Sequence, residues 1–169
     1  MTGEAGAEHR DAIDAIIEQW RRERPDLDLS AMDVLGRLAM VTRAVEGRVE
    51  DVLTRHGLGR GEFDVLAALR RSGSPYTLIP SELSATLMMS RAGMTSRLDR
   101  LEAAGLVSRS LDQADRRSFR VTLTDEGREI IDSTLTDHAA TLKRLVSGLA
   151  PEDVATMTRI LRTLLDTVA

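Results

Sequence analysis

The side chains with the most evident chemistry in this sequence are arginines and small hydroxyl residues between positions 88 and 120. This stretch holds seven arginines and four acidic residues, a net charge of +3, whereas the chain of 169 residues carries −4 as a whole. Arginine can bind a guanine edge or a phosphate through two parallel hydrogen bonds, and serine or threonine can bind bases or phosphates. A local basic patch can bind nucleic acid even when the whole protein is acidic. The pattern therefore predicts recognition of DNA.

The first group of candidate DNA-binding residues lies on a predicted helix over residues 91–104. Its outward face near the N-terminus carries Ser90, Arg91, Thr95, Ser96 and Arg100. Leu98 and Leu101 are expected to face inward, and Ser90 is placed to cap the helix. A recognition helix needs short polar or arginine side chains on its outward face to read the major groove. The alternative for this helix, taken alone, is a solvated amphipathic helix that binds nothing.

The second group lies in the sequence DQADRRS and consists of Asp115, Arg116 and Arg117. The flanking segments 106–112 and 118–124 alternate with a two-residue period, which predicts a β-hairpin with these residues at its tip. A tip arginine can enter the narrow, electronegative minor groove, and Asp115 can hold a neighbouring arginine in place. An ordinary polar turn is the alternative.

Catalytic and metal chemistry find no support in the sequence. His9, His56 and His138 are far apart and lack a metal-ligand spacing. No phosphate-binding loop, nucleophile elbow or metalloprotease motif is present. The absence of cysteine excludes disulfides, thiol redox sensing and cysteine-ligated metals. We therefore expect neither an enzyme nor a bound cofactor or metal.

The subcellular location is predicted from the apolar runs and from the N-terminal sequence. No apolar run approaches the roughly 20 residues that cross a bilayer. The acidic, polar N-terminus MTGEAGAEHRDAID is unlike a secretory signal. We expect a cytoplasmic protein without a membrane partner.

Long helices are expected on both sides of this segment, because apolar residues recur there every three or four positions. The predicted helices cover residues 9–23, 30–56, 61–71, 81–88, 91–104, 125–146 and 151–168, and the hairpin lies between the fifth and the sixth. The order is α-α-α-α-α-β-β-α-α. It predicts a mainly α (α+β) fold, a winged helix-turn-helix with long helices that form a dimerisation region.

The predicted organisation is an extra N-terminal helix over residues 1–29 and a main domain over 30–169. Within that domain the winged helix-turn-helix covers 60–124, and the dimerisation helices cover 30–57 and 125–169. The two C-terminal helices are too apolar to stand in solvent alone. A two-fold dimer would bury them and place two recognition helices about 34–36 Å apart, one turn of DNA. Packing within one monomer is the alternative.

The chain resembles the MarR family of bacterial regulators from about residue 32 to the C-terminus. The segments that carry the resemblance are SELS at 81–84, MTSRLDRLEAAGLVSR at 94–109 and DQADRRSFRVTLTDEG at 112–127. The resemblance implies an obligate dimer of triangular shape, in which the arginine at the place of Arg117 enters the minor groove. One departure is Ile79, where many members have Thr or Ser. A helix cap is lost there or moves to Ser81.

The added N-terminal helix is similar to that of one branch of the family, the regulators that respond to urate. In that branch the residues matching Trp20, Asp64, Arg97 and Arg109 form the effector site. The chemistry is coherent, because the indole can stack on a flat heterocycle, the arginines can neutralise an anion, and the carboxylate can accept ring N–H groups. Packing of Trp20, an Asp64–Arg97 ion pair and a phosphate contact at Arg109 are the alternatives. Another purine or a phenolic acid are alternative ligands.

The function expected from these features is a ligand-responsive transcriptional regulator, a repressor that binds a pseudopalindromic double-stranded DNA operator as a homodimer. Its small-molecule effector would be urate or a similar purine or phenolic anion. The alternative is a winged-helix module that binds protein instead of DNA.

Overall fold

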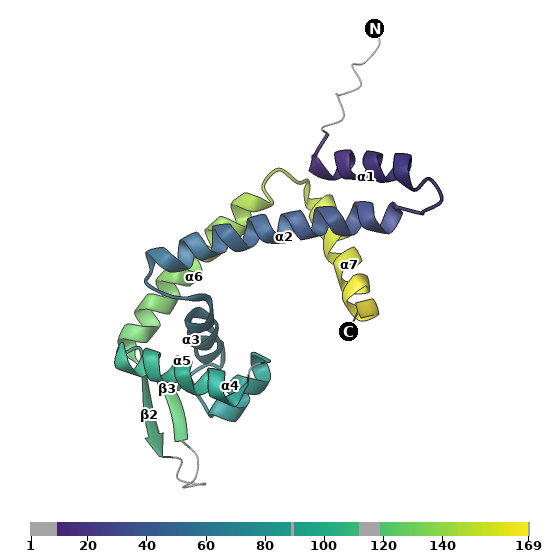
Figure 1. The fold of residues 1–169 in the computed structure, drawn as a ribbon. Coiled ribbons are helices and arrows are strands. Elements are labelled where there is room, and N and C mark those ends of the chain that lie inside the picture. Colours follow the sequence, from purple (N-terminus) through teal and green to yellow (C-terminus); the bar gives the residue numbers. More distant parts are fainter. Residues whose placement is uncertain (1–9, 89, 112–118, 169) are drawn as a thin grey trace. The chain divides into compact units, whose positions relative to one another are not determined.

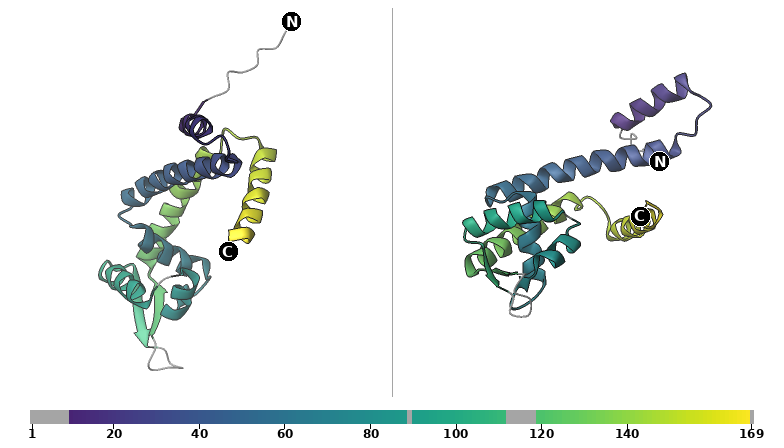
Figure 2. Two further views of the ribbon diagram at one scale, coloured as in Figure 1. Left: turned by 45° about the vertical axis from the view of Figure 1, so that its right-hand side comes forward. Right: turned by 60° about the horizontal axis from the view of Figure 1, so that its bottom comes forward.

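The computed structural model describes residues 10–88, 90–111 and 119–168, and the chain forms two compact units that meet at Gly47 and Arg48. The first unit contains helix α1 (Ala12–Glu23) and most of helix α2 (Ser30–Arg55). Figure 2 shows α1 alongside the N-terminal part of α2 in both views.

The first unit is held together by a small apolar contact. Ile13 and Ile17 of α1 are buried together with Leu29, which precedes α2. Gly36 on α2 makes the approach close, since a Cβ atom there would lie 3.0 Å from Cδ1 of Ile13. The Asp11 side chain caps α1 by accepting the N–H groups of Ile13 and Asp14.

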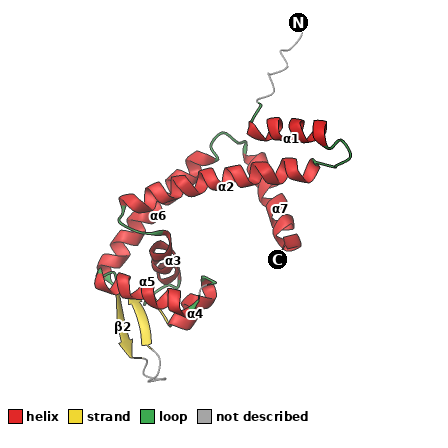
Figure 3. Cartoon of the chain, viewed as in Figure 1, coloured by secondary structure: helices red, strands yellow, loops and turns green. Residues whose placement is uncertain are grey.

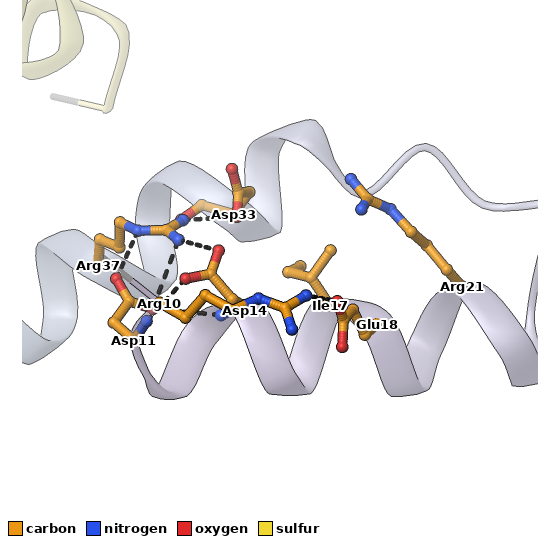
Figure 4. Close-up of a pocket in the computed structure, with 8 residues that line it drawn as sticks. All are labelled: Arg10, Asp11, Asp14, Ile17, Glu18, Arg21, Asp33 and Arg37. Carbon is orange, nitrogen blue, oxygen red and sulfur yellow. Dashed lines mark hydrogen bonds and ion pairs between the residues drawn. The ribbon is translucent and has the colours of Figure 1, made fainter. Parts of the chain in front are cut away.

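An ion cluster around Arg37 fixes the same pair of helices. The Arg37 guanidinium donates to Asp11 at 2.8 Å, to Asp14 at 2.6 Å and to Asp33 at 2.5 Å. Figure 4 shows the two carboxylates of the α1 end and the one of α2 around this single cation. One arginine therefore ties the start of α1 to α2.

The second unit holds the remaining elements, shown in Figures 1 and 3. They are α3 (Arg60–Arg71), β1 (Thr77–Leu78), α4 (Pro80–Thr86), α5 (Arg91–Ala103), β2 (Val107–Leu111), β3 (Phe119–Leu123), α6 (Asp125–Leu145) and α7 (Pro151–Val168). Its core consists of the apolar faces of α3, α4, α5 and α6 with the last turns of α2. The fully buried members include Leu53, Val65, Leu66, Leu69, Leu83, Met94, Leu98, Val121 and Ile131.

The sheet is small and antiparallel, with the strand order β1-β3-β2. β2 and β3 form a hairpin in which Val107 faces Leu123 and Leu111 faces Phe119. The predicted hairpin and fold class are confirmed. The predicted order lacked β1, which pairs Thr77 with Thr122. Two residues are too few to show the alternation that identifies a strand.

Acidic side chains accept backbone N–H groups at the starts of α2 and α4. Ser30 lies inside α2, and the carboxylate of Asp28 accepts its N–H at 2.9 Å. At α4 the side-chain cap is lost, which is one of the two expected outcomes, because Ile79 is the N-cap residue and makes no side-chain cap hydrogen bond. The Glu82 carboxylate accepts the Ile79 N–H at 2.9 Å.

Acid should release α1 from α2. A hydrogen bond from the Asp11 N–H, and then one from Arg37, hold the pKa of Asp14 below its ordinary value of 3.8. Such a group stabilises the folded state above its unfolded pKa, and this contribution is lost as the pH falls through the lower folded pKa. Trp20, the single tryptophan, lies on α1 and can report the change by fluorescence.

Arg37→Gln should move this acid transition to higher pH, because Asp14 loses a stabilising cation. Arg22→Gln, an exposed arginine of α1, is the matched control and should keep the wild-type midpoint. Equal midpoints in all three proteins would contradict the role given to Arg37.

Candidate nucleic-acid interface and effector site

Helix α5 is positioned by its buried stripe and by its cap. Met94, Leu98 and Leu101 are each exposed by 2% or less. The Ser90 Oγ accepts the Gly93 N–H at 3.2 Å, so the predicted cap is confirmed. α4 packs against α5, as in a helix-turn-helix.

The outward face of α5 carries the predicted polar residues. Thr95, Ser96 and Arg100 are exposed, and Ser90 is exposed at the helix start. Arg91 is the first residue of the helix. Because Met94, Leu98 and Leu101 take the buried face, Thr95, Ser96 and Arg100 are the side chains that the helix offers to a groove of DNA.

Arg100 is held on this face by two partners. Its Nε donates to Oε1 of Glu62 on α3 at 2.7 Å, and its Nη1 donates to Oγ of Ser96 at 2.9 Å. The hydrogen bond from Arg100, the one from the Gly59 N–H and the nearby charge of Arg97 keep the pKa of Glu62 below 4.5. No local pattern in the sequence indicates the bond between Glu62 and Arg100.

The tip of the hairpin, residues 112–118, lies outside the described residues. Asp115, Arg116 and Arg117 are in this segment, so their contact with DNA stays a prediction. The strands on either side are paired from Val107–Leu123 to Leu111–Phe119. The hairpin is therefore formed up to the point where the tip begins.

Arg97 lies directly on the first turn of α3. A Cβ atom at Gly61 would be 2.2 Å from its Cζ atom, so only glycine leaves room for the guanidinium in this position. Asp64, half-buried, is one turn further along the same flank of α3.

Arg109 occupies the other side of α5. Its guanidinium donates to Asp99 at 2.6 Å, pairs with Glu102 at 3.3 Å and lies 5.2 Å from the ring centre of Phe119. Asp99 and Glu102 flank the buried stripe on the side away from Arg97, given 3.6 residues per turn. An effector at Arg109 would have to compete with these two carboxylates.

Trp20 belongs to the first unit, where it lies on α1 with 44% of its surface exposed. Its place in an effector site with Asp64, Arg97 and Arg109 stays a prediction. The pocket of about 420 Å³ between α1 and α2 is lined by charged side chains and Ile17, and none of these four residues lines it. Figure 4 shows that pocket around Arg37.

The histidines in the described residues have structural contacts. The His56 Nε2 lies 2.9 Å from Oδ2 of Asp137 on α6. His138 packs against Phe63 of α3, with ring centres 5.2 Å apart. Among the described residues no cluster of acids or histidines could hold a metal ion. These contacts join α3 and the end of α2 to α6.

Two short helices followed by a paired hairpin define a winged helix-turn-helix DNA-binding protein. The sequence model of the MarR family matches residues 56–118. The HTH-type transcriptional regulator PecS of Dickeya dadantii (strain 3937) is 40% identical over 141 residues, which cover 83% of this chain and 85% of that protein. The chain belongs to the MarR family, and it is a DNA-binding transcriptional regulator rather than an enzyme.

Solved structures agree with this fold. AbsC, a MarR family regulator from Streptomyces coelicolor, has a TM-score of 0.75 and 24% identity, and the match covers 84% of this chain and 96% of that one. A mutant MarR from E. coli, complexed with operator DNA, has a TM-score of 0.69 and 27% identity, with 81% and 97% covered. No helix in the described ranges is long and apolar enough to cross a membrane.

Gly61→Ala should displace Arg97 while leaving the fold intact. The new methyl group would meet the far end of a flexible side chain, which can swing away. Alanine also favours a helix by roughly 0.5–1 kcal/mol over glycine, so the thermal midpoint should not fall. The displacement is measured as a shift of the Arg97 Nε–H signal in an NMR spectrum.

Gly47→Ala is the matched control, because nothing lies within 4 Å of a Cβ atom at that helical glycine. It should leave the Arg97 signal in place. An unchanged Arg97 signal in Gly61→Ala would be incompatible with the position described for this side chain.

Proposed function

We propose that this protein is a repressor that binds a pseudopalindromic operator as a homodimer and is released by a small anionic or aromatic ligand such as urate. The observation that carries the operator role is the outward face of α5, where Thr95, Ser96 and Arg100 are exposed beside the paired hairpin. Ser90, Arg91 and the tip residues Asp115, Arg116 and Arg117 complete the proposed DNA contacts. Family membership favours this role over a module that binds only protein.

The proposed effector site consists of Asp64, Arg97 and Arg109 together with Trp20. The strongest support comes from Arg97, because the same helix bears the DNA-facing residues and the guanidinium rests on α3 at Gly61. A ligand that draws Arg97 or Asp64 toward itself would change how α5 sits on α3. A coupling free energy of about 1–3 kcal/mol would suffice to weaken DNA binding roughly tenfold.

The proposed dimer interface includes the C-terminal helices. α7 has 18 residues and buries none of them. Met157, Ile160, Leu165 and Val168 expose apolar side chains on it, as do Leu142, Leu145 and Val146 near the end of α6. Exposed apolar side chains gathered on two successive helices favour an interaction site here.

Ile160→Asp should convert the dimer to a monomer, because a carboxylate in an apolar interface loses its hydration. Light scattering after size-exclusion chromatography should give a mass near the 18.6 kDa of one chain, where the wild type gives twice that value. Ala155→Asp, an exposed residue on the opposite side of α7 from Ile160, is the control and should stay dimeric. A dimeric Ile160→Asp protein would place the interface elsewhere.

Urate should weaken operator binding, and effector-site variants should lose this response. Fluorescence anisotropy on the DNA upstream of the protein's own gene, titrated with and without urate, measures both quantities. We expect about a tenfold rise in Kd with urate for the wild type, and none for Asp64→Ala or Trp20→Ala. Asp51→Ala, an exposed carboxylate of α2, is the matched control and should respond like the wild type.

The outcomes separate the parts of the proposal. Tight binding that urate leaves unchanged keeps the regulator and removes urate as its ligand. Absence of binding at low salt, where phosphate contacts are strongest, would contradict the operator role.

A further inference from the structure

Glu62 is a charged side chain of α3 that binds Arg100 of α5 and is largely shielded from solvent at the proposed DNA interface. Its side chain is 20% exposed, whereas that of Arg100 is 57% exposed. Oε2 accepts the Gly59 N–H at 2.7 Å, which caps the start of α3, and Oε1 accepts the Arg100 Nε–H at 2.7 Å. The carboxylate is therefore a fixed point that joins α3 to the outward face of α5.

The two hydrogen bonds of Arg100 leave the terminal N–H groups of its guanidinium available for DNA. An arginine has five N–H donors, and Glu62 takes the one on Nε while Ser96 takes one on Nη1. The Nη2 group and one Nη1 proton are not used by these two partners. They are sufficient for the two parallel bonds to O6 and N7 that identify guanine.

Because Glu62 and Ser96 fix the Arg100 side chain before DNA binds, two consequences follow for DNA binding. Its rotamer freedom is already reduced before DNA arrives, so less entropy is lost on binding. The negative charge of Glu62 also opposes attraction of this corner of α5 to phosphate, which carries no sequence information. Both effects favour a base contact over a phosphate contact.

We propose that Glu62 is a positioning residue for sequence recognition, which aims Arg100 at a guanine in each half of the operator. The inference rests on the DNA-reading role proposed for Arg100. It adds a residue of α3, outside the recognition helix, that determines specificity without touching DNA. Through Arg100, Glu62 would determine the preference for a G·C pair at a single position of each half-site.

The test is a selection of binding sites from random-sequence DNA duplexes by the full-length wild type and by Glu62→Gln. Glutamine has the same size and keeps an oxygen for the Gly59 N–H, but it lacks the charge that holds the guanidinium. We expect the preference for G·C to fall about tenfold at one position per half-site, with the other positions unchanged. Binding to a scrambled duplex should stay equal or tighten.

Two further variants make the result specific. Arg100→Lys keeps the positive charge and Glu62, and it should lose the preference at the same position, because an ammonium lacks the planar fork. The double variant should lose no more there than Arg100→Lys alone. Glu129→Gln, an exposed carboxylate of α6, should keep every wild-type preference.

The outcomes of these experiments distinguish an error in this inference from an error in the proposed function. If Glu62→Gln tightens binding to operator and scrambled DNA alike and keeps all base preferences, Glu62 is only a repulsive charge and the inference is wrong. If Arg100→Lys keeps all preferences while the protein still selects an operator, Arg100 does not read a base, and the inference fails although the regulator stands. If the wild type selects no sequence, the proposed function itself fails.

Discussion

Three side chains of α5, Met94, Leu98 and Leu101, are buried in the core of the second unit. Burial of side chains of this size stabilises by about 1.5–3 kcal/mol each, and a rotation of α5 about its axis would expose all three at once. The stripe therefore fixes the direction of every other side chain on this helix. Ser96 and Arg100 face outward for this reason, Thr95 lies on the flank of the partners of Arg109, and Arg97 lies on the other flank.

The first turn of α3 contacts one residue of the proposed effector site and one of the proposed reading face. Gly61 receives Arg97 and the next residue, Glu62, binds Arg100. The charge of Arg97 also acts on the Glu62 carboxylate. A ligand that moved Arg97 would thus alter the electrostatic surroundings of the group that holds Arg100. Coupling between effector and DNA would need only these neighbouring residues, without a long path through the protein.

The sequence was informative wherever the evidence was local. The inward positions of Leu98 and Leu101, the Ser90 cap and the two strands of the hairpin follow from spacing and from residue type, and they were predicted. The strand β1 was missed because its two residues pair with β3 about 45 positions away, and a segment so short has no periodicity of its own.

The contacts of the candidate site are harder to predict from the sequence than the fold is. A glutamate three residues after Gly59 is a recognisable capping signal, but its bond to Arg100 joins residues 38 positions apart. Arg109 was interpreted as an effector residue, and nothing in its neighbourhood along the chain indicates that Asp99 and Glu102 bind it. Long-range ion pairs depend on how α3, α5 and β2 pack together, which no local pattern encodes.

A crystal structure of the full-length protein bound to a duplex obtained by selection would show directly whether the outward face of α5 reads DNA. We expect α5 in the major groove, with the Arg100 guanidinium on a guanine edge and its Nε still bound to Glu62. A structure in which α5 lies outside the groove, or in which Arg100 has left Glu62 for a phosphate, would contradict this expectation.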